Sequence, residues 1–368
     1  MPCPAVSGQA LVPMSALLEG AQTSMDEPIT ALAAMKPRET MTAVHVSPRG
    51  GERLLADIGG TNARFAWQNG AAGLINDLMT LPCAEHLTLA DAIQQYLTMV
   101  GRSAPPNCAI AIANPVLGDR VQMTNHHWSF SISALRAHFG FAKLRVLNDF
   151  TALALALPTL RPEELRQVRG GQAVPLAAIG LVGPGTGLGV SGLLSNGRGG
   201  WIPIEGEGGH VTLAACTPRE QAVLQWFSSR YGHASAERTV CGQGLVDIHR
   251  AVQEIDCAEA IVELDAAGVA SAVLERSDPT AREALDLFCA YLGTAAGNLA
   301  LTLGARGGVY IGGGIVARFG EAFERSSFRQ RFEAKGRFTQ YLAEIPVYVI
   351  QAKQSPALRG AALALDDE

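Results

Sequence analysis

Three glycine-rich segments carry residue types that can bind phosphate. The first, residues 57–62, reads Asp-Ile-Gly-Gly-Thr-Asn and ends an apolar stretch. Paired glycines let backbone N–H groups approach an anion with no Cβ in the way, and Thr61 and Asn62 add short side-chain donors. Asp57 is suited to hold a hydrated Mg²⁺, because that ion keeps most of its waters. An ordinary hairpin turn is the alternative interpretation.

The other two segments follow apolar stretches later in the chain. Residues 183–189 read Gly-Pro-Gly-Thr-Gly-Leu-Gly. Residues 312–314 are three glycines between a predicted strand at 309–311 and a predicted helix, whose N-terminal amides suit a nucleotide. Each segment alone is a weak signal, but the three together, in this order, favour phosphate binding.

A competing pattern lies within the second segment. Residues 187–192 match the dinucleotide fingerprint G-x-G-x-x-G. That fingerprint has to open a helix, whereas residues 190–194 followed by Ser-Asn-Gly predict a strand and a turn. We therefore interpret the match as accidental. A Walker loop is excluded, because the chain contains no GxxxxGK[ST].

Candidate acid–base and sugar-binding side chains lie between these segments. Asn148 and Asp149 follow a predicted strand at 144–147 and precede a predicted helix at 150–157. A carboxylate there can accept the proton of an attacking alcohol, although a simple helix cap is the alternative for this pair. Glu207 and His210 enclose two glycines, so both side chains can reach one ligand, and their polar atoms suit sugar hydroxyls.

The predicted elements alternate in type, which indicates an α/β fold. Each half opens with a strand, a Gly/Thr-rich turn and a second strand, which is a weak internal repeat. Further strands are predicted at 54–58, 64–68, 108–113, 177–182, 188–194 and 347–351, and further helices at 87–100, 218–231, 244–253, 258–267, 281–303 and 355–365.

Composition limits the classes of partner. The chain has 368 residues, 48% hydrophobic and 17% charged, which predicts a large core and two lobes. A formal net charge of -5 without any Lys/Arg run argues against a nucleic-acid or membrane surface. No apolar stretch approaches the roughly 20 residues of a membrane-spanning helix. We expect neither nucleic acid nor membrane as a partner.

Seven scattered cysteines, with no CxxC pair, speak against a disulfide framework or a structural zinc site. We expect reduced, mostly buried thiols in a cytoplasmic protein. Residues 1–50 stand apart, since they lack sustained periodicity and the features of a signal peptide. A disordered leader and a mis-assigned start, with Met41 as the true first residue, both remain open for them.

Long ordered blocks extend these observations: ADIGGTNARFA, MTNHHWSFS, LNDFTALALALP, GPGTGLGV, EGEGGH, GHASAERTVCGQGL, GGVYIGGGIVARF and IPVYVI. From about Leu54 to about Leu363, the chain resembles the bacterial-type glucokinase family of the hexokinase/actin/chaperone superfold. The resemblance implies a two-lobed hexokinase-type α/β fold with a cleft between the lobes. Residues 51–159 plus 350–368 would form a smaller α/β lobe, and residues 160–349 a larger α+β lobe. The family pattern lacks the leader at 1–50.

The resemblance also implies a role for each candidate residue. Asp149 would be the base that takes the proton of the 6-hydroxyl of glucose. ATP, Mg²⁺ with ATP rather than a protein-bound metal, and a homodimer are implied as well. The implied sugar ligands are Asn148, Glu207, His210 and Glu237, and the implied ATP contacts are Asp57, Gly59, Gly60, Thr61, Asn62, Gly185, Thr186, Gly187, Gly313 and Gly314.

The predicted function is thus ATP-dependent phosphorylation of glucose to glucose 6-phosphate. A kinase for mannose, fructose or an N-acetyl amino sugar is the alternative within enzymes. A sugar-binding regulator without turnover is the alternative from another class. A filament or chaperone ATPase of the same superfold should lack EGEGGH. The phosphoryl donor, the regulation and the sugar affinity stay open.

Overall fold

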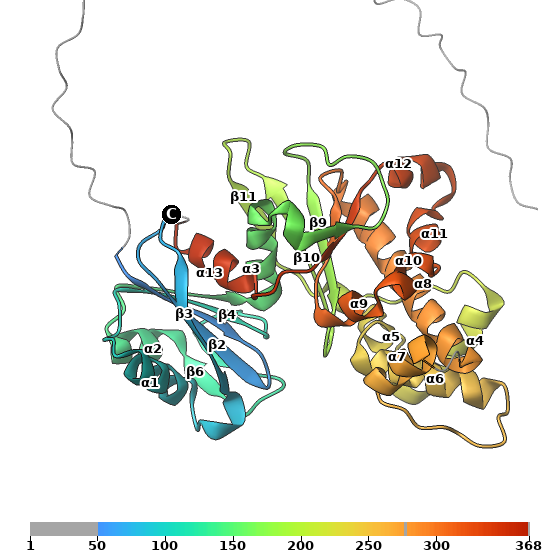
Figure 1. Cartoon of the computed structure of the whole chain (residues 1–368), viewed down its shortest axis with the longest axis horizontal. Helices are drawn as coiled ribbons and strands as arrows, with labels where there is room; N and C mark the ends of the chain where they lie inside the picture. The colour runs from blue at the N-terminus through green and yellow to red at the C-terminus, as the bar shows by residue number, and fades with distance from the viewer. Residues whose placement is uncertain (1–50, 276–277, 367–368) are drawn as a thin grey trace, which may run out of the picture. The chain divides into compact units, whose positions relative to one another are not determined.

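The computed structural model describes residues 51–275 and 278–366, which lie in one compact unit, Ser47–Glu368. The predictions for residues 1–50 fall outside these described residues. Two sheets organise the described chain (Figure 1). β5 (Arg120–Gln122) and β6 (Ser129–Ser131) form a separate two-stranded sheet, from which Val121 and Phe130 pack on the core of the first sheet.

The first sheet has the order β3-β2-β1-β4-β7. β1 pairs with β2 in antiparallel fashion and with β4 in parallel, and β4 pairs with β7 in parallel. Alternate residues of β1 enter two cores: Leu54, Ala56 and Ile58 share one with α1, whereas Leu55 shares the other with α3 and α13. The elements are β1 (Arg53–Ile58), β2 (Asn62–Gln68), β3 (Ile75–Pro82), α1 (Leu89–Val100), β4 (Asn107–Ile112), α2 (Ile132–Phe139), β7 (Lys143–Asn148), α3 (Asp149–Ala156) and α13 (Ala357–Ala364).

The second sheet has the order β11-β10-β9-β12-β13-β8. Its apolar face and the helices of the later half share one large core. The strands are β8 (Leu165–Gln167), β9 (Ile179–Pro184), β10 (Leu188–Ser195), β11 (Trp201–Ile204), β12 (Val309–Ile311) and β13 (Val347–Ile350). The helices are α4 (Pro218–Tyr231), α5 (Ala236–Thr239), α6 (Gly242–Ile255), α7 (Ala266–Glu275), α8 (Pro279–Leu303), α9 (Gly314–Phe319), α10 (Glu321–Arg325), α11 (Phe328–Glu333) and α12 (Thr339–Ala343).

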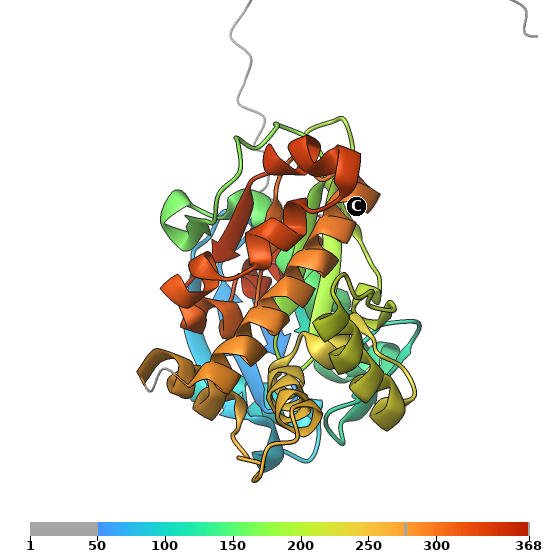
Figure 2. The same ribbon diagram turned by 90° about the vertical axis from the view of Figure 1, so that its right-hand side faces the viewer.

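Helix α8 corrects one expectation about apolar stretches. By length and composition alone its 25 residues could cross a membrane, contrary to the sequence prediction. The helix is instead largely buried within the protein, where it packs against α6, α7 and α11 (Figure 2). Small residues let neighbours approach it closely, since a Cβ at Gly297 would lie 2.5 Å from the carbonyl oxygen of Phe332. We interpret α8 as the central core helix of the second sheet's helical layer.

The helix predicted at 258–267 is wrong. Residues 258–265 form an irregular segment, and α7 begins only at Ala266. The side chain of Gln253, on α6, accepts a bond from the N–H of Val262 at 2.7 Å and donates to its carbonyl at 3.1 Å. These bonds replace the helical pairing of Val262. Asp265 then accepts from the N–H of Gly268 at 2.7 Å, in the manner of a helix cap.

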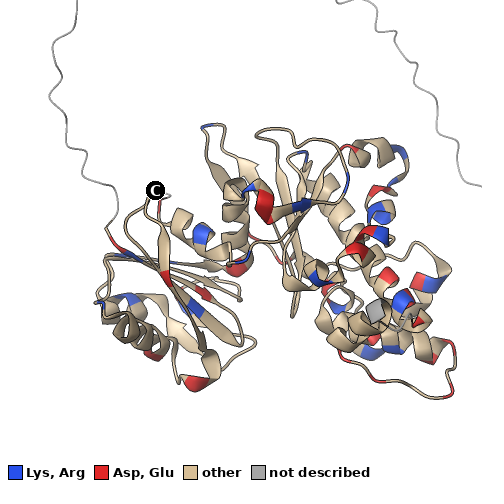
Figure 3. Ribbon diagram, in the orientation of Figure 1, with Lys and Arg blue, Asp and Glu red and all other residues tan. Residues whose placement is uncertain are grey.

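Other predictions differ in smaller ways. β3, β11 and α2 had not been predicted. β3 is an edge strand with many exposed positions, β11 is an edge strand of only four residues, and α2 is short. The strand interpretation of residues 190–194 is confirmed, since they belong to β10, and the dinucleotide match is therefore accidental. Of the six described cysteines, Cys83, Cys108, Cys241 and Cys289 are buried, and Cys216 and Cys257 are exposed. Basic and acidic residues are interspersed over the described chain (Figure 3).

The C-terminal helix α13 returns to the first sheet and packs closely on α3. A Cβ at Gly360 would overlap the backbone carbonyl of Ala152 on α3, so only glycine allows this approach. Arg53 of β1 also binds Asp366, at 2.5 Å, just beyond α13. The chain end is thus part of the structure that supports α3.

We expect Gly360→Ala to lower the free energy of unfolding by about 1–3 kcal/mol, because the added methyl group forces α13 away from α3. Urea unfolding monitored by circular dichroism measures this change. Gly118→Ala is the matched control, since nothing lies within 4 Å of a Cβ at Gly118. Equal stability of the two variants would contradict the close packing.

Candidate active site

The first phosphate-binding candidate is the turn between β1 and β2. Asp57 pairs with Arg64 across the two strands, and the N–H of Gly59 bonds the carbonyl of Asn62 at 2.9 Å. The Asp57 carboxylate is buried and forms an ion pair with Arg64 at 3.3 Å. The alternative interpretation, a hairpin turn, is thus correct for the backbone. In this turn Thr61 is exposed and Gly59 and Gly60 are partly exposed, as anion binding would require.

Parallel pairing brings Asp149 to the same edge of the sheet as this turn. The last residues of β1, β4 and β7 are aligned, with Ile58 opposite Ile112 and Ile112 opposite Asn148. Ligands of open α/β sheets bind outside the carboxyl ends of such strands. Asp149 is the first residue of α3, so its side chain leaves the sheet at this edge.

The structure separates the roles of Asn148 and Asp149. Asn148 is the N-cap of α3, and its Oδ1 accepts from the N–H groups of Phe150 and Thr151 at 2.9 and 3.2 Å. The helix-cap alternative is therefore correct for Asn148. Its amide nitrogen lies 3.5 Å from the carbonyl oxygen of Asn114. Asn148 would thus serve a ligand through this amide nitrogen, as a donor.

The Asp149 carboxyl has the raised pKa expected of a proton acceptor that works near neutral pH. Burial raises this pKa to about 6, and the nearby Asp57 carboxylate and then, more weakly, Glu207 add to the rise. The N–H of Phe150, which bonds Asp149 Oδ1 at 2.9 Å, lowers it in part. Carboxylates from the first turn, from α3 and from the Glu207 segment therefore lie close enough to influence one another.

The predicted sugar ligands form a second group. His210 Nε2 lies 3.9 Å from Glu207 Oε2, and His210 Nδ1 lies 3.8 Å from Glu237 Oε1. Glu207 precedes a short 3-10 helix, Gly208–His210, and His210 is its last residue; both are exposed. Gly209 packs against the backbone of Leu188, which leaves no room for a larger residue there. Three polar side chains from two segments thus face one another.

Glu237 also connects this group to the second glycine-rich segment. Its Oε2 accepts from the N–H of Leu188 at 3.0 Å, and a Cβ at Gly187 would overlap the same carboxylate. Gly185 to Gly187 form the tip of the β9–β10 hairpin, in which the N–H of Gly185 bonds the carbonyl of Gly187 at 2.8 Å. Thr186 is exposed at this tip.

The third glycine-rich segment lies directly beside the second. Gly313 has a φ of 78°, a value that favours glycine, and a Cβ there would overlap the carbonyl of Pro184. Gly314 starts α9 and is exposed. The N–H of Gly242, at the start of α6, bonds the carbonyl of Gly185 at 2.9 Å. The starts of α6 and α9 therefore both adjoin the second segment.

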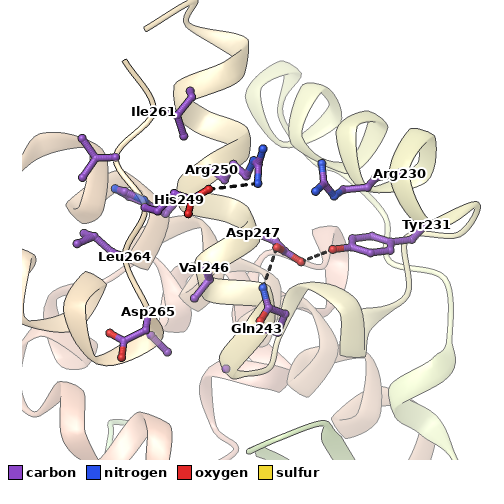
Figure 4. Close-up of a pocket in the computed structure, with 14 residues that line it drawn as sticks. Arg230, Tyr231, Gln243, Val246, Asp247, His249, Arg250, Ile261, Leu264 and Asp265 are labelled. Atoms are coloured by element: carbon purple, nitrogen blue, oxygen red, sulfur yellow. Dashed lines mark hydrogen bonds and ion pairs between the residues drawn. The ribbon is translucent and has the colours of Figure 1, made fainter. Parts of the chain in front are cut away.

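A pocket of about 560 Å³ begins at Gly242. Figure 4 shows its lining, with Gln243, Val246 and Asp247 contributed by α6 and Leu264 by the irregular segment before α7. Asp247 is held in place by Tyr231 at 2.7 Å and by Gln243 at 3.0 Å. The pocket is lined by both apolar and charged side chains, and through Gly242 it adjoins the second glycine-rich segment.

Sequence reasoning missed two asparagines that support the site. The carbonyl of Asn114 faces the Asn148 amide, and Asn114 Oδ1 accepts from the N–H of Thr124 at 3.1 Å. Asn125 packs on Gly60, with its Cβ 3.1 Å from where a Cβ of Gly60 would lie. The position of Asn114 after β4, one of the parallel strands, was the signal available for it. Among the described residues, no cluster of three His, Cys, Asp or Glu could hold a metal ion.

The family follows from comparison with known proteins. Residues 54–368 match the family model described as Glucokinase. The chain belongs to the glucokinase family. It is 53% identical over 316 residues to a glucokinase of Aromatoleum aromaticum, a match that covers 86% of this chain and 95% of that relative. It is also 53% identical over 320 residues to a glucokinase of Chromobacterium violaceum, covering 87% and 91% of the two chains.

A solved structure supports the same conclusion for the fold. The crystal structure of a glucokinase from an Antarctic psychrotroph is 34% identical and superposes with a TM-score of 0.78, over 87% of this chain and all of that one. The predicted family and hexokinase-type α/β fold are confirmed. The roles of individual residues in this glucokinase-family chain stay predictions.

The raised pKa of Asp149 has a consequence for stability. An acid that holds its proton more tightly when folded destabilises the fold as the pH rises from its unfolded pKa, near 3.9, through its folded pKa, about 6. We expect Asp149→Asn to raise the free energy of unfolding by about 1–3 kcal/mol at pH 8, and to have little effect at pH 4. Urea unfolding at the two pH values measures both.

Asp119→Asn serves as the control of opposite sign. Bonds from Ser131 and Ser133 lower the pKa of Asp119, so its removal should cost stability at pH 8. A gain for Asp149→Asn that is equal at pH 4 and pH 8 would show that the charge is not its cause.

Proposed function

We propose that this glucokinase-family chain transfers the γ-phosphate of ATP to the 6-hydroxyl of glucose, with Asp149 as the base. The observation that carries the proposal is the position of the half-buried Asp149 carboxylate. Asp57 from the first glycine-rich turn and Glu207 from the polar group both lie close enough to raise its pKa. A proton acceptor between an anion-binding turn and a set of hydroxyl ligands is the arrangement that sugar phosphorylation needs.

In the proposed reaction, Asn148, Glu207, His210 and Glu237 orient the sugar so that its 6-hydroxyl faces Asp149. The carboxylate accepts the hydroxyl proton as the oxygen attacks the γ-phosphorus. The bond from that phosphorus to the bridging oxygen breaks, and ADP leaves. With its raised pKa near 6, Asp149 is largely ionised at neutral pH and is also basic enough to accept the proton.

The glycine-rich turns provide the phosphate contacts in this proposal. N–H groups and short side chains of Gly59, Gly60, Thr61 and Asn62 would face one part of the triphosphate. Gly185, Thr186 and Gly187 would face another, from the second sheet. Asp57 would hold Mg²⁺ through its waters, because it places a carboxylate at this turn; the ion, when bound with ATP, neutralises charge on the transferring phosphoryl group.

We infer that the adenosine lies past Gly313 and Gly314, toward the pocket that begins at Gly242. Gly242 bonds Gly185, and Ile315 lies 3.8 Å from where a Cβ of Gly242 would be. A nucleotide whose phosphates reach Gly185 would thus have an apolar wall within reach, formed in part by Val246 and Leu264. Binding pockets of this kind combine apolar walls with a few polar groups.

The two lobes, 51–159 plus 350–368 and 160–349, stay a prediction from the resemblance. β13 lies in the second sheet, and α13 returns to the first. Closure of one lobe on the other would exclude water during transfer. The homodimer and the cytoplasmic location stay predictions from the resemblance and from the cysteine pattern.

Two alternatives have distinct consequences. A kinase for mannose, fructose or an N-acetyl amino sugar would use the same base and turns with another set of hydroxyl contacts. A sugar-binding regulator would bind without turnover, so a carboxylate with a raised pKa would have no task. The 53% identity to glucokinases and the presence of Asp149 favour the glucose enzyme.

We expect Asp149→Asn to lower kcat for glucose about 10²–10⁴-fold, while glucose binding is retained. A coupled assay measures kcat and KM, and calorimetry measures binding. Asp119→Asn, an exposed carboxylate of the first sheet's loops, should keep wild-type kcat. The same assay with mannose, fructose and an N-acetyl amino sugar ranks kcat/KM. ATP consumption that is independent of sugar, or near-full activity of Asp149→Asn, would refute the proposal.

We expect Asp57→Asn to raise the Mg²⁺ concentration needed for half-maximal activity, because the amide lacks the charge that attracts the hydrated ion. The same change removes one cause of the raised Asp149 pKa, so the acidic limb of the kcat/KM profile should move to lower pH. Titration of Mg²⁺ at fixed ATP, and kcat/KM between pH 5 and 8, measure the two effects. An unchanged Mg²⁺ requirement would contradict the proposal that Asp57 holds the hydrated ion.

A further inference from the structure

Phe150 is the residue directly after the proposed base, and it belongs structurally to both sheets. Its backbone N–H bonds Asp149 Oδ1 and Asn148 Oδ1, each at 2.9 Å. Its ring, in contrast, leaves the first sheet and packs on strands β9 and β10 of the second. One residue therefore touches the carboxylate with its main chain and the opposite sheet with its side chain.

The ring occupies space that glycines leave open. A Cβ at Gly189 would overlap three ring atoms, and a Cβ at Gly183 would lie 2.5 Å from the ring's Cζ. Gly183 and Gly189 face each other across the β9–β10 hairpin, and Gly185 to Gly187 form its tip. The Phe150 ring thus lies at the base of the second glycine-rich segment.

The same ring reaches the third glycine-rich segment. Its Cζ lies 3.8 Å from where a Cβ of Gly312 would be, and the side chain of Leu153, one turn later on α3, lies 2.9 Å from that point. Gly312 bonds β9 through the carbonyl of Val182 at 2.9 Å. Both glycine-rich segments of the second sheet therefore rest against the first turn of α3.

We propose that Phe150 is a positioning residue, which sets the distance between the Asp149 carboxylate and the two glycine-rich segments of the second sheet, residues 183–189 and 312–314. The inference rests on the proposed function. Phosphoryl transfer depends on placing the nucleophile and the phosphorus correctly, and a misplacement of about 1 Å can cost about 100-fold in rate. An aromatic ring packed against glycine backbone is suited to this task, because the close contacts at Gly183 and Gly189 leave no space into which the ring could shift.

We expect Phe150→Ala to lower kcat for glucose about 100-fold, with a much smaller change in KM for glucose. Glu207, His210 and Glu237 keep their own contacts in this variant. Phe150→Leu, which fills part of the space, should recover part of kcat. Steady-state kinetics measure these values, and urea unfolding shows that each variant is folded.

Leu155→Ala is the matched control. Leu155 lies on the same helix and is 7% exposed, but it is not among the nearest neighbours of Gly183, Gly189 or Gly312. Its truncation should lower the urea concentration at the midpoint of unfolding and leave kcat near the wild-type value. An equal loss of kcat in Phe150→Ala and Leu155→Ala would assign the effect to general loosening and overturn the inference.

A double-mutant cycle tests the contact itself. Gly189→Ala should lower kcat strongly in the wild-type background, because the methyl group displaces the ring, and only weakly in the Phe150→Ala background, where the space is open. Equal losses of kcat in both backgrounds, or wild-type kcat for Phe150→Ala, would overturn the positioning role of Phe150. The proposed function would still stand as long as the wild type phosphorylates glucose. If neither the wild type nor Leu155→Ala phosphorylates glucose, both the proposed function and the role of Phe150 are refuted.

Discussion

Helix α3 packs closely against glycine residues of its neighbours on two sides, and the rest of the structure depends on this packing. On one side, Gly360 of α13 meets the carbonyl of Ala152. On the other, Phe150 and Leu153 meet Gly183, Gly189 and Gly312 of the second sheet. Protein interiors are packed like crystals, so a shift of α3 by a fraction of an ångström is resisted from both sides. The helix that begins with Asp149 is thereby positioned relative to both sheets.

This packing has an electrostatic consequence at the start of α3. A carboxylate at a helix N-terminus is ordinarily favoured by the helix dipole and by N–H bonds, which lower its pKa. For Asp149, burial and the carboxylates of Asp57 and Glu207 outweigh the bond from Phe150, and the pKa rises to about 6. The raised pKa of Asp149 lowers the stability of the fold at neutral pH, and it makes the carboxylate basic enough to accept a proton.

Much of the fold could be predicted from local pattern. Strands such as β1 and β12 are short apolar runs followed by glycine, and helix α4 coincided with its predicted bounds, 218–231. The segment at 258–265 could not be predicted, because its backbone is held by the side chain of Gln253 from another element. β3 and β11 were missed for a related reason: an edge strand is stabilised by its neighbour, so its own sequence need not alternate strictly.

The sequence by itself determined the chemistry: three glycine-rich turns, a carboxylate at a strand end, and the polar pair around two glycines of EGEGGH. These signals are local, since each depends on neighbouring residue types. Only the tertiary structure decided which of them act together. Parallel pairing of β1, β4 and β7 brought Asp149 beside Asp57, Glu237 joined the polar group to Leu188, and Phe150 joined α3 to the second sheet. Such contacts join residues far apart in the chain, and they arise only when both sheets pack around α3.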